Sequence, residues 1–326
     1  MRRQGAGPRR CRTRVAVRRG MGPRRVLLSR CDGSCADPLM RASVREHFPR
    51  VMEPNDARRL AASGPADLGR SFCIVTGASK GLGRSIARQV AALLRPQSTL
   101  VLVARSGDKL KELQAELAAS GAGEAGGLVV RLVAADLGAK DGVERVVREA
   151  REASSADIEH LMLFNNAASL GDVSRYAQSF TDMDEVDSYL SFNVSSALSL
   201  TAGVLQAFPR RRGLQRTLVN ISSLCALQPF PSWSLYCTGK AARTMMFRVL
   251  AEEEPDLRVL NYVPGPMDTD MQVQARSTLD PKLRKAVCDM WSQGQLLTCE
   301  ESCSKLMMLL LKDDYQSAAH MDYFDL

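Results

Sequence analysis

The chain has 326 residues, of which 45% are apolar and 25% charged, a composition typical of a globular protein with one large domain or two small ones. Its net charge of +8 arises in residues 1–50, where fourteen arginines outnumber three acidic residues and give a local balance of +11. The rest of the chain therefore carries −3, which argues against a nucleic-acid or membrane-surface role for the body of the protein.

The nine cysteines are scattered, without a CxxC pair and without histidines at metal-binding spacing, so we expect no metal site and a reducing compartment. No apolar run is long enough for a membrane span or a secretory signal. We therefore expect a cytoplasmic protein without nucleic-acid or membrane partners.

Residues 1–69 form a basic leader rich in Gly, Pro and paired arginines, for which we expect disorder. An Arg-rich, acid-poor start also fits a mitochondrial transit peptide, but the glycines and prolines interrupt the amphipathic helix that such peptides form. We favour an over-extended start, because Met21, Met40 and Met52 offer later ones. An arm that binds RNA or a membrane is the remaining alternative, although Phe48 is the only aromatic residue among the arginines.

From residue 71 onward, short β-rich apolar runs alternate with helical patterns. In chain order the predicted elements are strand 72–75, helix 82–94, strand 99–104, helix 109–118, strand 128–134, helix 143–153, strand 161–164, helix 186–208, strand 217–221, helix 234–253, strand 259–263 and a last strand near 321–324. This alternation predicts a single doubly wound Rossmann-type α/β domain over residues 70–326, with a mostly parallel sheet and helices on both faces. Substrate specificity is expected from loops such as residues 266–295.

The first strand runs into a glycine-rich turn, residues 76–83, which opens the first helix. Gly77, Gly81 and Gly83 let the backbone approach phosphates, and a helix N-terminus supplies free N–H groups and partial positive charge. An ordinary tight turn is the alternative, but the strand–turn–helix context favours a dinucleotide site.

The second strand ends in Arg105 and Ser106 without an acidic residue, and Lys80 lies inside the glycine-rich turn. A ribose 2′-hydroxyl is bound by a carboxylate at this point, whereas a 2′-phosphate needs cations. We therefore predict NADP(H) as the cofactor; two solvated surface charges are the alternative. Asp136 and Leu137, after the third strand, are expected at the adenine, and Asn165, Asn166 and Ala167, after the fourth, in the dinucleotide groove.

Tyr236 and Lys240 lie one helical turn apart, and Ser223 follows a predicted strand. A phenol has a pKa of about 10, so it is a poor acid–base group at neutral pH unless a positive charge stabilises its phenolate. We expect Lys240 to supply that charge and to lower the pKa of Tyr236. Tyr236 would then protonate a carbonyl oxygen held by Ser223, while hydride passes from the nicotinamide to the carbonyl carbon. Asn193, in the long helix, is expected to hold a water that links Lys240 to solvent. Each motif alone is also found on ordinary surfaces, but their order after the glycine-rich turn argues against coincidence.

These motifs, in this order over about residues 71–265, resemble the short-chain dehydrogenase/reductase family. Ala168 departs from the pattern, because the family prefers glycine there. The expected cofactor contacts, part of them implied by this resemblance, are Gly77, Ser79, Lys80, Gly81, Leu82, Gly83, Arg105, Ser106, Asp136, Leu137, Asn165, Lys240, Pro264, Gly265, Met267, Asp268 and Thr269.

Within that family, residues 169–173, 220–230 and 264–271 and the C-terminal residues 319–322 resemble the members that reduce pterins. The resemblance implies a homodimer that reduces pterin side-chain carbonyls with NADPH at the last step of tetrahydrobiopterin synthesis. It also implies that Asp322 anchors the amino-pyrimidine ring, with substrate contacts from Ser223, Tyr236 and Gly265. A reductase of other small ketones or quinones and a non-catalytic nucleotide-binding regulator are the alternatives; an intact Ser223, Tyr236 and Lys240 argue against the regulator.

Overall fold

The computed structural model describes residues 67–121, 127–154 and 157–326, so the predicted leader lies almost wholly outside the described residues. The described strands form one parallel sheet in the order β3-β2-β1-β4-β5-β6-β7. The strands are β1 (Ser71–Thr76), β2 (Thr99–Ala104), β3 (Val129–Ala134), β4 (His160–Asn165), β5 (Gln215–Ile221), β6 (Leu257–Val263) and β7 (His320–Asp322). The predicted doubly wound α/β fold is confirmed.

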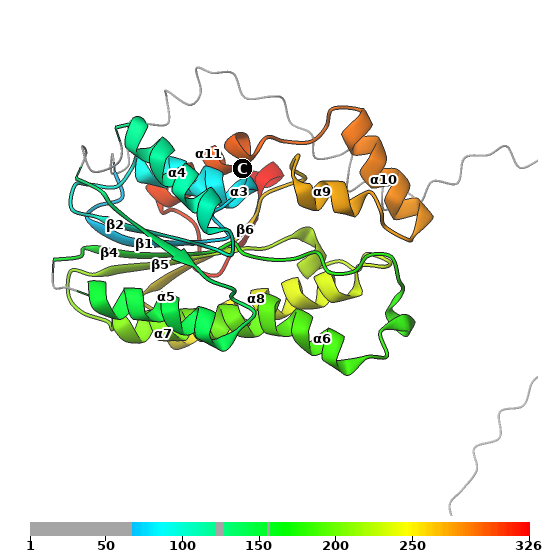
Figure 1. Ribbon diagram of the computed structural model, residues 1–326, viewed down its shortest axis with the longest axis horizontal. Coiled ribbons are helices and arrows are strands. Elements are labelled where there is room, and N and C mark those ends of the chain that lie inside the picture. The colour runs from blue at the N-terminus through cyan, green and yellow to red at the C-terminus, as the bar shows by residue number, and fades with distance from the viewer. Residues whose placement is uncertain (1–66, 122–126, 155–156) are drawn as a thin grey trace, which may run out of the picture. The chain divides into compact units, whose positions relative to one another are not determined.

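Helices cover both faces of the sheet (Figure 1). On one face lie α3 (Gly81–Ala91), α4 (Gly107–Ala119) and α11 (Cys299–Lys312). On the other face lie α5 (Lys140–Ala153), α7 (Ser196–Ala207) and α8 (Ser234–Glu253). Two hydrophobic cores result, one on each side of the sheet.

The central strand β1 shows why this sequence forms a buried sheet. All six of its residues are buried, and successive side chains point to opposite faces. Phe72 and Ile74 pack into the core beneath α5, α7 and α8, while Cys73 and Val75 pack beneath α3, α4 and α11. A continuous apolar run is therefore required here, because both faces of the strand need a packed partner.

The single helix predicted over residues 186–208 is in fact two helices separated by a π-helical turn. α6 (Met183–Leu190) leads into the turn Ser191–Ser195, which leads into α7. Such a turn adds one residue within a helix and often marks a functional position. Apolar periodicity does not reveal it, because the segments on either side of the extra residue are each helical by themselves.

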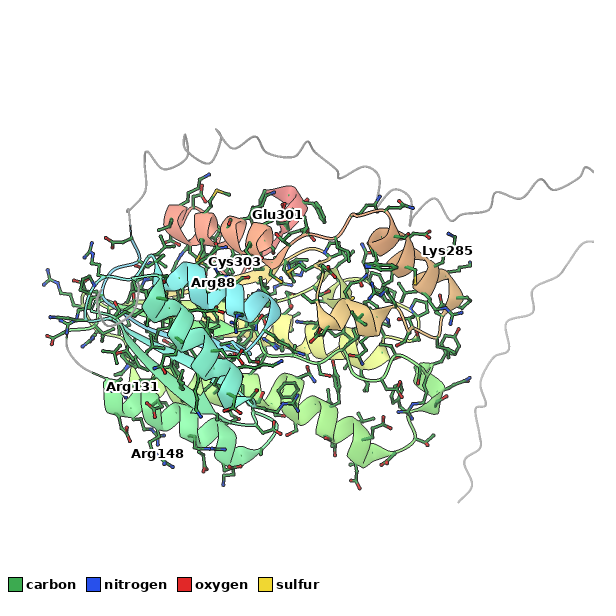
Figure 2. The ribbon with its side chains drawn as sticks, turned by 45° about the horizontal axis from the view of Figure 1, so that its top comes forward. Arg88, Arg131, Arg148, Lys285, Glu301 and Cys303 are labelled. Atoms are coloured by element: carbon green, nitrogen blue, oxygen red, sulfur yellow. The ribbon has the colours of Figure 1, made fainter. Side chains whose placement is uncertain are left out.

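The segment 266–295, expected as loops, contains α9 (Asp270–Ala275) and α10 (Pro281–Ser292). These helices and α11 were missed by the sequence analysis, although each has a clear N-terminal signal. Thr269 and Asp280 cap α9 and α10, and Thr298 and Glu301 form a capping box at α11. Figure 2 labels Glu301 in the first turn of α11.

The folded region begins before the predicted boundary at residue 70. Leu68 is buried in the core, its N–H donates to the Leu93 carbonyl at 2.8 Å, and its carbonyl lies 3.1 Å from His160 Nδ1. Asp67 pairs with Arg95 at 2.9 Å. At the other end, β7 stops at Asp322 and the chain continues as a 3-10 turn, Tyr323–Asp325, instead of the predicted strand to 324.

Candidate active site

A cavity of about 440 Å³ lies at the carboxyl ends of β1 to β6. It opens where the strand order reverses between β1 and β4, the usual ligand position in doubly wound sheets. The predicted residues that line it are Gly77, Ser79, Lys80, Gly81, Leu82, Gly83, Arg105, Leu137, Tyr236, Lys240, Pro264, Met267, Asp268 and Thr269. The structure thus brings together residues from both ends of the predicted site.

The conformation of the glycine-rich turn lets an anion come close to its backbone. Gly77 and Gly81 have φ of +69° and +54°, values that favour glycine, and a Cβ on Gly83 would lie 2.2 Å from the Gly77 carbonyl oxygen. No side chain caps the N-terminus of α3 at Lys80, and the first turn of α3 contains no acidic residue. The helix N–H groups therefore face the cavity with their partial positive charge uncompensated, which fits a pyrophosphate.

The two cations predicted for a 2′-phosphate have different surroundings. Arg105 is exposed at the end of β2 and lines the cavity. Lys80 lines it too, but its Nζ lies 2.6 Å from Asp270 Oδ2 at the start of α9, which keeps the pKa of the Asp270 carboxyl below its usual value. The glycine-rich turn and α9 are thus joined by an ion pair at the cavity.

The turn after β4 departs from the prediction at Asn165. Asn165 points into the core and donates to Thr201 Oγ1 on α7 at 3.0 Å, so it does not line the cavity. Asn166 and Ala167, the other two residues expected in the groove, do line it: Asn166 donates to the Thr76 carbonyl at 2.8 Å, and the Ala167 N–H donates to Thr76 Oγ1 at 3.0 Å. Side chains alternate along a strand, so a one-residue difference decides which amide faces the groove.

Three further predicted cofactor residues lie outside the lining of this cavity. Asp136 accepts a hydrogen bond from the Gly138 N–H of its own loop at 2.9 Å. Ser106 occupies the N-cap position of α4. Gly265 has a φ of +72° and packs so closely that a Cβ would lie 2.8 Å from Leu297 Cδ1. In this structure these residues shape the loops that border the cavity.

Tyr236 and Lys240 project from one face of α8, and both are buried. Lys240 Nζ donates to the Ile221 carbonyl at 2.7 Å and lies 5.4 Å from the centre of the Tyr236 ring. Ser223 follows β5, and its Oγ accepts from the Cys225 N–H at 3.2 Å. The Ser223 hydroxyl also lies close enough to the phenol to lower the pKa of Tyr236.

Burial is the largest cause of the pKa shifts of both Tyr236 and Lys240. Desolvation raises the pKa of Tyr236 above its ordinary value, and it lowers the pKa of Lys240 well below its ordinary value. Lys240 was expected to lower the pKa of Tyr236, but desolvation outweighs the groups that lower this pKa, and its net shift is upward. Tyr236 is therefore held in its protonated form at neutral pH, the state that a proton donor requires.

Asn193 lies in the π-helical turn and is buried. Its Oδ1 accepts from the Ser169 N–H at 2.8 Å, and its Nδ2 donates to the Tyr189 carbonyl at 3.0 Å. The side chain that was expected to hold a water is hydrogen-bonded to the protein at both ends. It fixes the loop after β4 next to α6.

Asp322 ends β7 and pairs in register with Val263 at the end of β6. It therefore lies at the carboxyl ends of the strands, as the cavity does. It is half-buried, and its Oδ1 accepts from the Phe324 N–H at 3.0 Å. Neither Asp322 nor Ser223 belongs to the cavity lining. Ser223 directly follows Ser222 of the lining, and Asp322 is paired with Val263, the residue before Pro264 of the lining.

Arg243 is the residue of this region that the sequence analysis missed. It is fully buried on α8, three residues after Lys240 and seven after Tyr236, which places all three on one face of the helix. This spacing was the available signal, since a charged residue in phase with the catalytic pair is unexpected at a core position.

The comparisons with known proteins agree with this geometry. A model of the short chain dehydrogenases matches residues 71–280. The sepiapterin reductase of Xenopus tropicalis is 51% identical over 267 residues, which are 82% of this chain and 100% of that protein. That of Bos taurus is 49% identical over 260 residues, 79% of this chain and 96% of that protein.

The chain is a short-chain dehydrogenase. Among solved structures, the KRED1-Pglu enzyme superposes with a TM-score of 0.64 at 29% identity, covering 77% of this chain and 99% of its own. As a member of this family the protein is an oxidoreductase, and its cavity is the expected place for a nicotinamide dinucleotide. Within the described residues, no helix is long and apolar enough to cross a membrane, and no cluster of three or more His, Cys, Asp or Glu could hold a metal ion.

Proposed function

We propose that this short-chain dehydrogenase is a sepiapterin reductase, which reduces the side-chain carbonyls of a pterin with NADPH at the last step of tetrahydrobiopterin synthesis. The observation that carries the proposal is the identity of about half of all residues to sepiapterin reductases over almost their full length. The buried Tyr236–Lys240 pair beside a dinucleotide-sized cavity supplies the chemistry that such a reduction needs.

The charges around the cavity support NADP(H) over NAD(H). Arg105 lines the cavity at the end of β2, where an NAD-dependent enzyme places a carboxylate. Lys80 lines the same cavity from the glycine-rich turn. Both cations lie where they would contact a 2′-phosphate, and the N-terminus of α3 would hold the pyrophosphate.

NADPH, when bound, supplies the hydride for the carbonyl carbon. Tyr236 donates the proton to the carbonyl oxygen, because burial keeps its phenol protonated until transfer. Ser223 donates a hydrogen bond to the same oxygen and fixes its position. Lys240, oriented by the Ile221 carbonyl, lies close to the phenolate that remains after transfer and stabilises it.

Asp322 is proposed as the anchor of the pterin ring. A carboxylate accepts two hydrogen bonds from a guanidine-like edge such as the amino-pyrimidine of a pterin. Because β7 pairs with β6, and the loop after β6 lines the cavity, the carboxylate stands at the distal end of the proposed substrate site.

We further propose a homodimer formed through α7 and α8. Leu198 on α7 and Met245 and Val249 on α8 are 49%, 55% and 47% exposed, an unusual concentration of apolar surface on neighbouring helices. Covering this surface with its copy gives a symmetric interface. A cytoplasmic location is proposed as well, consistent with the six free thiols of the described residues.

Asp322→Asn tests the substrate assignment, with Asp325→Asn as the matched control. Asparagine can still cap the last turn, so the fold should be retained. We expect kcat/KM for sepiapterin to fall about 100-fold, since two charge-assisted hydrogen bonds are weakened, while a small dicarbonyl is reduced at the wild-type rate. Asp325 is exposed, so its change should affect neither substrate. Equal turnover of sepiapterin by both variants would contradict the role of Asp322 as the pterin anchor.

A further inference from the structure

Arg243 is a buried cation whose hydrogen-bond partners are all neutral. Its side chain is 2% exposed, and its guanidinium donates to Asn220 Oδ1 at 3.0 Å, to the Ala167 carbonyl at 3.0 Å and to the Asn165 carbonyl. Among the described ion pairs, none includes Arg243. Burial lowers its pKa to about 10, which still leaves it charged at neutral pH.

A buried charge without a counter-ion is costly, and neutral residues can join two strand ends equally well. The positive charge therefore calls for a role that a neutral side chain would not fill. Such uncompensated charges are concentrated at functional sites. The contacts of Arg243 indicate two effects, one geometric and one electrostatic.

The geometric effect passes through Ala167 to the glycine-rich turn. The Ala167 carbonyl accepts from Arg243, and the Ala167 N–H donates to Thr76 Oγ1 at 3.0 Å, so the backbone of this residue is held from both sides. Gly77 lies directly against it, because a Cβ on Gly77 would be 3.1 Å from Ala167 Cα. A shift of the arginine head would therefore move the cavity wall that faces Tyr236.

The electrostatic effect acts on the proton-transfer pair. The titratable groups that face Arg243 are Tyr189 of α6 and Tyr236 and Lys240 of α8; the groups from β4 and β5 are carbonyls and amides. Its charge lowers the pKa of both phenols and adds to the lowering of the Lys240 pKa by burial. Cys225, also near this pair, acts in the opposite direction.

We propose that Arg243 is a positioning residue of the active site, which holds the turn after β4 against the glycine-rich turn and sets the charge around Tyr236 and Lys240. The proposal rests on the proposed function only for the reaction that serves as a readout. NADPH binding can be measured without any substrate.

The test compares Arg243→Met and Arg243→Lys with Arg248→Met, which removes an exposed arginine from the same helix. NADPH affinity is measured by fluorescence titration, and kcat and KM are measured for sepiapterin across pH. For Arg243→Met we expect weaker NADPH binding and a kcat about 100-fold lower, the effect of a displaced cavity wall. The alkaline limb of the pH profile should move to higher pH, since loss of a nearby positive charge raises the pKa of Tyr236 and of Lys240 alike.

Arg243→Lys separates the two effects. It keeps the charge, so the pH limb should stay at its wild-type position, but an ammonium does not reproduce the planar fork that spans three acceptors, so NADPH affinity should recover only in part. Arg248→Met should match the wild type in every readout.

A purely structural role would lower the melting temperature and the folded fraction of Arg243→Met while its NADPH affinity, KM and pH limb stay unchanged, and that result would overturn the proposal. If Arg243→Met does not fold, wild-type NADPH affinity in Arg243→Lys overturns it. A wild-type protein that binds NADPH but leaves sepiapterin unchanged refutes the pterin assignment alone, because the titration still tests Arg243.

Discussion

Lys80 has two competing partners at the cavity. Its ammonium lies 2.6 Å from Asp270 Oδ2, with the two side chains 61% and 75% exposed, and it also lines the site proposed for the 2′-phosphate. An exposed ion pair of this kind is weak and easily exchanged. Binding of NADPH should therefore draw Lys80 from Asp270 to the phosphate.

Replacing Asp270 by Asn should strengthen NADPH binding. The change removes the competing carboxylate from Lys80 and a negative charge from the cavity, so the affinity should rise by at most about fivefold, the range of an exposed ion pair. NADH affinity should rise less, because NADH carries only the pyrophosphate charges and has no 2′-phosphate for Lys80 to contact. Titration of both cofactors at low and high salt checks this, and an equal gain for NADH would refute a 2′-phosphate role for Lys80.

Part of the site could be predicted from the spacing of individual residues in the sequence, and part could not. The glycine-rich turn, Tyr236 and Lys240 could be predicted because their chemistry demands fixed spacing, and the structure places all of them at one cavity. Asn165, Asn166 and Ala167 were all assigned to the groove; the last two line the cavity, but strand alternation turns Asn165 into the core. Arg243 was missed because its role depends on carbonyl groups that only the folded chain brings to it.

Among the elements, β4 connects the start of the domain to the site. His160 begins the strand and contacts the Leu68 carbonyl and Thr217 Oγ1, at 3.1 and 2.8 Å, while the turn after Asn165 forms the cavity wall. The imidazole is buried, and desolvation lowers its pKa below the usual value of 6.5. It is therefore neutral in the folded protein.

The burial of neutral His160 predicts that the folded protein loses stability in acid. Below pH 6.5 the unfolded chain binds a proton at His160 that the folded chain does not bind, so the free energy of unfolding should fall as the pH is lowered, by up to about 1.4 kcal/mol per pH unit. Urea unfolding at about pH 7.5 and 5.5 measures the effect, and His160→Gln should reduce it. A pH dependence equal in wild type and His160→Gln would contradict this origin.

The elements themselves differ in how well the sequence predicts them. Buried strands such as β2 and helices such as α8 were predicted with their observed bounds, because their apolar patterns are long and continuous. The π-helical turn was missed because apolar periodicity does not reveal one extra residue between two helical segments. α9 and α10 are short and peripheral, so their capping residues were the main signal.

For the whole molecule, the structure changes the prediction mainly at the start of the catalytic domain. The prediction separated a leader of residues 1–69 from a catalytic domain of residues 70–326. Leu68 is nevertheless part of the core on the α3 side of the sheet, and Asp67 pairs with Arg95. We propose that residues 67–326 form the catalytic unit and that residues 1–66 are dispensable for catalysis.

Two truncations test this boundary. A protein that starts at residue 67 should keep the melting temperature and the activity of the full chain. One that starts at residue 70 loses the buried Leu68, worth about 2 kcal/mol, and should melt about 4–8 °C lower. Calorimetry measures both; equal melting temperatures of the two truncations would contradict the contribution assigned to Leu68.

The most direct test of the account is NADPH oxidation with sepiapterin by residues 67–326, comparing the wild type with Tyr236→Phe. We predict that the wild type turns over sepiapterin and that Tyr236→Phe loses at least about 100-fold in kcat, because the proton donor is gone, while its NADPH affinity remains at the wild-type value. A folded wild type that binds NADPH without reducing sepiapterin, or a Tyr236→Phe variant as fast as the wild type, would contradict it.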